Sequence, residues 1–582
     1  MQAKYKESIK IYWYSFRKLI EFGKWSVPAI ILLQTIIELL TVLSTYLFGK
    51  LLGAFITDIK NFEIYSQPTL SVTLKESMSL RYLAYMSLVW VLKHIVTNII
   101  TPIDEYYHSI MLNRFQILIS TKFSKLNLEE IESNNIYDLI TKIQSFWYSR
   151  FDTLLSILKS IFGSTMGLIS VLALLLKENS LSVFLISLTI IPKVILLFVL
   201  ANENLNRIKR TGKARVLKAY TFNIILDVRT FAEKKINNLF SRLLDNLHQY
   251  GNFLSKEYLN ITNLSTINLA ISDLLGQIVL YINQFGIVNR IITKRVGIPE
   301  GINYINYLSL LLDKLNNLTT QVSTFFTLEP YLKYLYEYEN ISTLHEDNPG
   351  TTRLSTPITT IDIINLSVCF PGNNTIILSN INLSIKKGEK ILILGKDGEG
   401  KSSIIKTFSG LYRIRHGDIF INNLSIKDIS PGQWKDCISA VLDDFGRYYY
   451  SIKENIIMSK PTSSFDPKLY NKALSASLLD KWLEQNKIED TQLLGKIYPD
   501  GTEIPSGYWQ RITLARAIYS DKPVILLDEP FTFIDSKTRE QLLSNMMKIW
   551  ADRIIIMIDE DPKFARYFHK VYKICNSTIV PA

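Results

Sequence analysis

The sequence predicts an α-helical membrane domain with six transmembrane helices, followed by an α/β nucleotide-binding domain of the P-loop type. Long runs of leucine, isoleucine and valine recur over residues 1–330, whereas the rest of the chain alternates short strand-like runs with polar helical pattern. A glycine-rich loop stands between a strand and a helix in this second part. With 582 residues, the chain is long enough for two or more domains.

Four apolar runs are long enough to cross a bilayer, which takes about 20 residues. They cover 26–56, 82–102, 154–176 and 181–202. Soluble core helices are the weaker interpretation, because they seldom stay apolar on every side over such a length. Two further runs, 262–288 and 304–328, complete the six spans. The polar residues that interrupt them are Asn283, Gln284, Asp313, Lys314, Asn316 and Asn317.

The net charge of +12 raises the possibility of a nucleic-acid partner, but the basic residues gather at two places, 4–24 and 207–218. These segments flank an even number of spans, and the positive-inside rule assigns both to the cytoplasm. We therefore expect no nucleic-acid partner. We expect a multi-pass protein of the cytoplasmic membrane, with both termini and the nucleotide-binding domain in the cytoplasm. The three cysteines have no metal-like spacing.

The polar segment 340–358 contains proline and glycine and has no hydrophobic period, so we predict a linker there. The predicted domains are a transmembrane permease domain over 1–339 and a nucleotide-binding domain over 359–582. Two polar connectors between spans, 129–143 and 227–244, are expected to form helices that project from the membrane.

The stretch "EKILILGKDGEGKSSIIKTFSGL" (389–411) has the strand, loop and helix that a phosphate-binding loop requires. Its glycines let backbone N–H groups surround the phosphates, Lys401 reaches the terminal phosphates, and the Ser402 hydroxyl is a ligand for Mg²⁺. Asp397 and Glu399 weaken anion binding unless their side chains point outward. The predicted cofactor-binding residues of this loop are Gly395, Gly398, Gly400, Lys401, Ser402 and Ser403.

The stretch "KPVILLDEPFTFID" (522–535) is an apolar strand that ends in two acids. Asp528 is expected to hold Mg²⁺, and Glu529 to polarise an attacking water. Together with the upstream loop, this pair predicts a site for ATP and Mg²⁺.

These motifs, the intervening "IPSGYWQRITLARA" and the preceding spans make the chain resemble an ABC exporter half-transporter of the type 1 fold. The resemblance implies that Phe370 in "LSVCFPG" stacks on adenine, although a core phenylalanine is equally consistent with the pattern. It implies that Asp535 is the D-loop aspartate, and that 129–143 and 227–244 are coupling regions that rest on nucleotide-binding domains.

Several phrases are similar to exporters of lantibiotics and related modified peptides, the nisin type. They include "VLDDFGRYYYSIKENI" and "EDTQLLGKIYPDGTEIPSGYWQRITLARAI". This resemblance implies a peptide substrate. Export of a lipid or a drug remains open, because the spans carry no readable substrate motif.

The chain departs from the family pattern at three places. "IPSGY" (504–508) stands where the family has LSGGQ, so Pro505 replaces the serine and removes an N–H donor. Ser506 and Gly507 are the predicted nucleotide contacts there. Asp443 stands where the Q-loop glutamine is expected, and Asp559 where the switch histidine is expected. Both acids bring negative charge towards a phosphate.

The resemblance implies a dimer with a second half-transporter, either a second copy or a different chain. An ATP-driven peptide exporter is the leading interpretation, with Glu529, Asp559 and Asp443 as the catalytic set. A degenerate, ATP-binding regulatory half of a heterodimer is the alternative. The polar residues Asn283, Asp313 and Asn316 are expected either to line the path or to form hydrogen bonds between helices. His569 is expected to be an ordinary surface histidine.

Overall fold

The computed structural model describes residues 2–62, 77–132, 134–175, 180–341, 352–354, 357–370, 375–461 and 464–582. Most of the predicted linker, 342–351 and 355–356, lies outside the described residues. The described chain divides into two compact units. The membrane unit comprises 1–121 and 138–340, and the nucleotide unit comprises 122–137 and 341–582. The first predicted connector therefore begins within the nucleotide unit.

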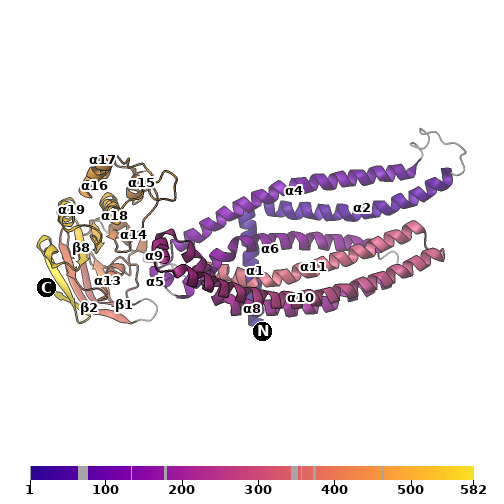
Figure 1. Cartoon of the computed structure of the whole chain (residues 1–582), viewed down its shortest axis with the longest axis horizontal. Coiled ribbons are helices and arrows are strands. Elements are labelled where there is room, and N and C mark those ends of the chain that lie inside the picture. The colour runs from indigo at the N-terminus through magenta and orange to yellow at the C-terminus, as the bar shows by residue number, and fades with distance from the viewer. Residues whose placement is uncertain are drawn as a thin grey trace. The chain divides into compact units, whose positions relative to one another are not determined.

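Most helices of the membrane unit are long and run side by side (Figure 1). Several of them are apolar over long stretches, as expected for helices that contact lipid on one side and each other on the other side. The helices are α1 (Gln2–Gly23), α2 (Ser26–Phe62), α4 (Met78–Phe123), α6 (Asn134–Leu175), α7 (Ser180–Leu188), α8 (Ile190–Leu226), α9 (Phe231–Ile236), α10 (Leu239–Ile292) and α11 (Ile298–Glu339).

Five helical segments among the described residues are long and apolar enough to cross a membrane: 26–60, 78–123, 150–175, 182–226 and 239–292. They include the fifth predicted span. The sixth predicted span lies in α11, a 42-residue helix that does not reach the same hydropathy. Its polar residues lower the hydropathy, whereas Leu308, Leu311 and Leu312 are buried in the core of the bundle.

The connector 227–244 makes a tight turn between α8 and α10. The short 3₁₀ helix η1 (Val228–Thr230) and α9 fill the turn. Lys234 is buried there, and its ammonium donates hydrogen bonds to the carbonyls of Ile224, Ile225 and Asp227. These carbonyls lie at the C-terminal end of α8, which leaves such groups without helical partners. The lysine therefore caps the helix and stabilises the turn.

The nucleotide unit contains two sheets. The antiparallel sheet has the order β2-β1-β4-β5, and the larger sheet has the order β10-β9-β3-β8-β7-β6. Strands β9, β3, β8, β7 and β6 are parallel, and β10 joins them in the antiparallel direction. The strands are β1 (Thr360–Cys369), β2 (Ile376–Lys386), β3 (Lys390–Leu394), β4 (His416–Ile421), β5 (Leu424–Ser425), β6 (Ile438–Val441), β7 (Val524–Asp528), β8 (Ile554–Asp559), β9 (Lys570–Cys575) and β10 (Thr578–Pro581).

Helices and the antiparallel sheet together bury the apolar residues of the larger sheet on both faces, as parallel sheets require. Successive residues of a strand point to opposite faces. Accordingly, Ile525 and Leu527 of β7 join one core cluster, whereas Val524 and Leu526 join the other. The helices are α5 (Leu128–Ile131), α13 (Lys401–Phe408), α14 (Pro431–Cys437), α15 (Ile452–Ile457), α16 (Pro467–Ala476), α17 (Leu479–Asn486), α18 (Ser506–Ser520), α19 (Ser536–Ile549) and the 3₁₀ helix η3 (Pro562–Tyr567).

Candidate nucleotide-binding site

The carboxyl ends of three neighbouring parallel strands form the candidate site. Leu394 at the end of β3 pairs with Asp559 at the end of β8, and Asp528 at the end of β7 pairs with Ile558. The glycine loop therefore leaves the sheet beside the segments that carry the predicted acids. Ligands of open α/β sheets bind at this edge.

The glycine loop has a backbone that needs its glycines. Gly398 and Gly400 have φ values of +83° and +88°, a left-handed region that side chains disfavour. A Cβ atom on Gly400 would also lie 2.6 Å from Cγ2 of Ile377. The helix α13 begins directly after this residue, at Lys401. The loop and the helix N-terminus thus have the arrangement of a phosphate-binding loop.

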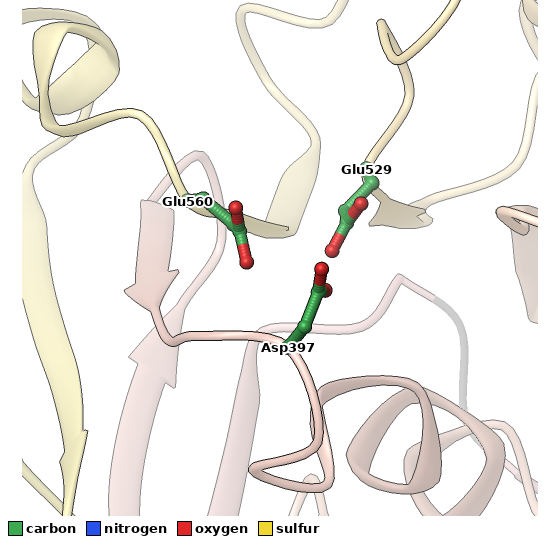
Figure 2. A group of neighbouring side chains, drawn as sticks. All are labelled: Asp397, Glu529 and Glu560. Atoms are coloured by element: carbon green, nitrogen blue, oxygen red, sulfur yellow. The ribbon is translucent and has the colours of Figure 1, made fainter.

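Lys401 is buried and is surrounded by three carboxylates. Its Nζ lies 2.5 Å from Oε1 of Glu529, 2.9 Å from Oε1 of Glu560 and 3.4 Å from Oδ1 of Asp397. Figure 2 shows these acids converging from three different loops. Burial lowers the pKa of Lys401, but the hydrogen bonds to Glu529 and Glu560 outweigh it, so the pKa is raised overall. The lysine therefore stays charged.

Asp528 is 1% exposed, and neither carboxylate oxygen has a hydrogen-bond partner among the described residues. Burial raises the pKa of Asp528 to about 6; the Ser402 hydroxyl lowers it, and the carboxylates of Asp443 and Glu529 raise it further. A buried carboxylate without a partner is costly unless a cation or donor completes it. Asp528 and Ser402 therefore fit a site for Mg²⁺, which prefers oxygen ligands.

Glu529 follows Asp528 in the left-handed region, with φ of +44°. Its N–H donates to the Ile558 carbonyl at 3.0 Å, and its own carbonyl accepts from Nε2 of Gln510 at 3.3 Å. Oε1 of Gln510 accepts the N–H of Phe533 at 2.9 Å. Gln510 of α18 thus forms hydrogen bonds to Glu529 and Phe533, at the two ends of the loop that follows β7. These bonds hold the backbone of Glu529 in place.

Asp559 is 9% exposed at the end of β8. Burial raises its pKa to about 6, hydrogen bonds from the backbone N–H groups of Asp561 and Glu560 lower it, and the Glu529 carboxylate raises it. Asp443 lies exposed in a turn after β6. Both predicted catalytic acids thus lie in the nucleotide unit, and their proposed roles remain predictions.

The signature segment begins α18 at Ser506, and Pro505 is the N-cap residue. The Ser506 hydroxyl accepts a hydrogen bond from Nη2 of Arg447 at 3.2 Å. A Cβ on Gly507 would lie 2.7 Å from the carbonyl oxygen of Phe533, so only glycine fits. Tyr508 stacks on Trp482 with ring centroids 4.1 Å apart. The bulky tyrosine thus packs on α17, and Ser506 supplies a hydroxyl at the helix N-terminus.

The remaining predicted residues take separate positions. Phe370 follows β1 and is 55% exposed, so it is not a core residue and its ring is accessible. Oδ1 of Asp535 accepts the N–H of Thr538 at 3.0 Å and caps α19, which lowers the pKa of Asp535. Ser403 is the third residue of α13. His569 is exposed, and its Nδ1 accepts the N–H of Lys390 at the opposite end of β3.

Sequence reasoning missed Glu560, although the run of acids after β8 signals it. The two acids of the glycine loop do not both point outward. Oε2 of Glu399 accepts the N–H of Lys396 at 2.7 Å, whereas Asp397 is 88% exposed but remains in contact with Lys401.

Residues 129–137 of the first connector belong to the nucleotide unit, and the coupling role of the connector remains a prediction. Glu129 pairs with Arg415, Oε1 of Glu130 lies 2.8 Å from Nη2 of Arg413, and Glu132 contacts Lys406 at 3.2 Å. Acids on and beside α5 therefore meet basic residues of α13 and of the segment that follows it. The second connector belongs to the membrane unit.

The polar residues of the membrane unit form contacts between helices. Nζ of Lys193 on α8 donates to Asp273 of α10 at 2.5 Å and to Asn316 of α11 at 3.0 Å. Asn283 bonds only to its own helix among the described contacts, and Asp313 is exposed. Asn316 thus makes the helix–helix contact expected of one alternative, and a role in lining the path remains a prediction.

Comparison with known proteins places residues 378–532 in the family described as ABC transporter. The chain is 24% identical to the subtilin transport ATP-binding protein SpaT of Bacillus subtilis, over 93% of this chain and 84% of the relative. It is 25% identical to the nisin transport ATP-binding protein NisT of Lactococcus lactis subsp. lactis, over 84% and 83%.

A solved structure, that of a bacterial Atm1-family ABC exporter with ATP bound, superimposes with a TM-score of 0.74 at 14% identity. The match covers 96% of this chain and 94% of that one. The predicted fold is thereby confirmed: a helical membrane region followed by an ABC-type nucleotide-binding domain.

Proposed function

We propose that this chain, an ABC half-transporter by its domain and its fold, exports a modified peptide of the lantibiotic class across the cytoplasmic membrane. The observation that carries the proposal is the similarity to the subtilin and nisin transport proteins, which extends over most of the chain. One membrane half and one nucleotide-binding domain make half of a pump, so the working unit is a dimer with a second half-transporter.

In this proposal, the nucleotide unit binds ATP with the residues at the carboxyl edge of its larger sheet. Backbone N–H groups of the glycine loop and the Lys401 ammonium bind the phosphates. Asp528 and Ser402 would hold Mg²⁺, which would supply positive charge to neutralise the transferred phosphate. Glu529 orients a water molecule and accepts its proton. ATP binding then closes two nucleotide domains, and the connectors transmit this closure to the membrane helices.

The test is ATP turnover by the purified chain in lipid, with the precursor peptides of nisin and subtilin as probes. A peptide exporter is expected to hydrolyse ATP faster when either precursor is present. Transport of a fluorescently labelled precursor into inverted vesicles measures export directly. Stimulation by lipids or hydrophobic drugs, with none by the peptides, would show that the substrate belongs to another class.

A second candidate function is the ATP-binding, regulatory half of a heterodimer. Asp559 favours it, because the chain has a buried carboxylate where the family pattern has a histidine, and a carboxylate repels a developing phosphate charge. Turnover that appears only after a second half-transporter is added would support this candidate. Turnover by the chain alone, abolished in Glu529→Gln, would support a homodimeric pump.

A further inference from the structure

Two carboxylates contact the donors that a phosphate would need. Oε2 of Glu399 accepts the backbone N–H of Lys396 at 2.7 Å, within the glycine loop itself. Oε1 of Glu560 lies 2.9 Å from Nζ of Lys401. Loop N–H groups and this lysine are the donors that hold phosphates in P-loop sites. Glu560 therefore places an anionic oxygen on a phosphate-binding donor, and Glu399 places one on the backbone of the glycine loop.

Glu560 is well placed to leave its position. It follows β8, on a different segment from the glycine loop, and its side chain is 51% exposed whereas that of Lys401 is 5% exposed (Figure 2). A half-exposed carboxylate regains water when it moves away, so its contact with the lysine is weak compared with a fully buried pair. Incoming phosphate can displace it at low cost.

The charges around Lys401 do not balance. Three carboxylates contact one ammonium, namely those of Asp397, Glu529 and Glu560. Their repulsion is relieved when one of them leaves, and a phosphate that approaches meets a net negative site. Glu529 has a proposed role with the attacking water, whereas Glu560 has no role in the proposed mechanism.

We propose that Glu399 and Glu560 act as built-in phosphate mimics, which occupy the phosphate-binding donors and must be displaced before a nucleotide binds. They set the nucleotide affinity of this chain below that of the same loop without them. The inference rests on the proposed function, because it assumes that the site binds ATP.

The experiment measures equilibrium binding of MgATP and MgADP to the full chain, purified in lipid, for wild type, Glu399→Gln, Glu560→Gln and the double variant. The glutamine side chains keep the shape and remove the charge. Each single variant is expected to bind both nucleotides about two- to fivefold more tightly, the range of a partly exposed ion pair. The double variant should bind both nucleotides more tightly than either single variant.

The matched control is Glu540→Gln. Glu540 pairs with Arg566 at 2.8 Å on the surface, and its side chain is 52% exposed, close to the value for Glu560. The Glu540→Gln variant removes the same charge from the same unit, and we expect it to leave the affinity for MgATP and MgADP unchanged. High salt should shrink the difference between wild type and Glu560→Gln, because it screens the repulsion between the glutamate and the phosphates.

The outcomes separate the two proposals. Wild-type chain that binds no nucleotide contradicts the proposed function itself. Wild-type chain that binds MgATP, with Glu560→Gln and Glu399→Gln equal or weaker in affinity, overturns the inference alone. A gain of equal size in Glu540→Gln would also overturn it, because the effect would then be one of overall charge. Thermal unfolding of each variant verifies that it is folded.

Discussion

The membrane unit and the nucleotide unit pair their buried lysines differently. Lys193 contacts one acid, Asp273, together with the amide oxygen of Asn316. Lys314 contacts one acid, Glu38, and the side chains of both are at most 15% exposed. Lys401 in the nucleotide unit contacts three acids.

Lys314 and Glu38 form a buried neutral pair, so neither partner gains by leaving, since departure would strand a buried charge. Asp273 is 49% exposed, and its pair with Lys193 is neutral but less buried. Three acids around one lysine give the cluster a net negative charge. Its electrostatic repulsion falls when one acid leaves. The difference indicates that the membrane pairs hold helices together, whereas the cluster around Lys401 is arranged to exchange partners with a ligand.

The largest expected effect concerns ATP turnover and the acids around Lys401 in the nucleotide unit. Glu529→Gln removes the proposed general base and one of the acids on Lys401. ATP turnover should fall by about 100-fold or more, the usual contribution of such a base, while MgATP binding persists. Phosphate release and equilibrium binding measure the two quantities, with Glu540→Gln as control. Turnover at the wild-type rate would exclude Glu529 from the chemistry.

The next effect concerns the stability that a buried lysine–acid pair gives to the membrane unit. Lys314→Met leaves the Glu38 carboxylate without its cation, and we expect a loss of about 3–5 kcal/mol in stability. The double variant Lys314→Met with Glu38→Gln should recover most of the loss, because no buried charge remains. Thermal unfolding in lipid nanodiscs measures both. A double variant as unstable as the single one would mean that the packing of the lysine chain, not its charge, matters.

A smaller effect concerns Asp559 and pH. Its folded pKa of about 6 lies above the unfolded value of 3.8, so the folded chain holds an extra proton between about pH 4 and pH 6. Stability from this group is therefore fully present below pH 4 and is lost as pH rises through 6. Without nucleotide or Mg²⁺, Asp559→Asn should be more stable than wild type at pH 7.5, by about 2 kcal/mol.

At pH 4.5 this difference should shrink to about a third, because folded wild-type Asp559 is then protonated while the unfolded carboxyl is still mostly ionised, and it should disappear below about pH 3.5. Thermal unfolding of both proteins at the two pH values measures it. An equal difference at both pH values would mean that shape rather than charge separates the variants.

The smallest effect lies at α5. The pair of Glu130 and Arg413 is partly exposed, with side chains 20% and 46% exposed. A double-mutant cycle of Glu130→Ala and Arg413→Ala should give a coupling energy of about 0.5–1 kcal/mol. The same cycle on Glu129 and Arg415, which are more buried, should give more. Equal values for the two pairs would show that burial does not govern this contact.

Sequence patterns predicted much of the site, because its chemistry depends on short local motifs. The order of strand, glycines and Lys401 occurs within one segment, and Asp528 and Glu529 end a run of apolar residues. In the structure, these segments lie at one edge of a sheet. Glu560 could not be assigned in the same way, since its contact joins residues 159 positions apart.

The membrane spans were also predicted in part from local sequence and in part only from the fold. Hydropathy identified the strongly apolar helices, because contact with lipid requires apolar side chains over the whole length of a span. Polar residues interrupt the last two predicted spans, in α10 and α11, and α11 does not reach the hydropathy of the other spans. The structure shows those residues in contact with other helices, where Lys314 meets Glu38 and Asn316 meets Lys193.

By itself, the sequence determined the two-part architecture, the glycine loop and the acids at the strand ends, because each depends on residue type and local spacing. Only the tertiary structure decided which acids contact Lys401, that both oxygens of Asp528 are buried without a partner, and that Glu399 turns onto its own loop. The physical reason is that the free energy of a charged group depends on burial and on neighbours distant in sequence, and only the packed fold brings these together.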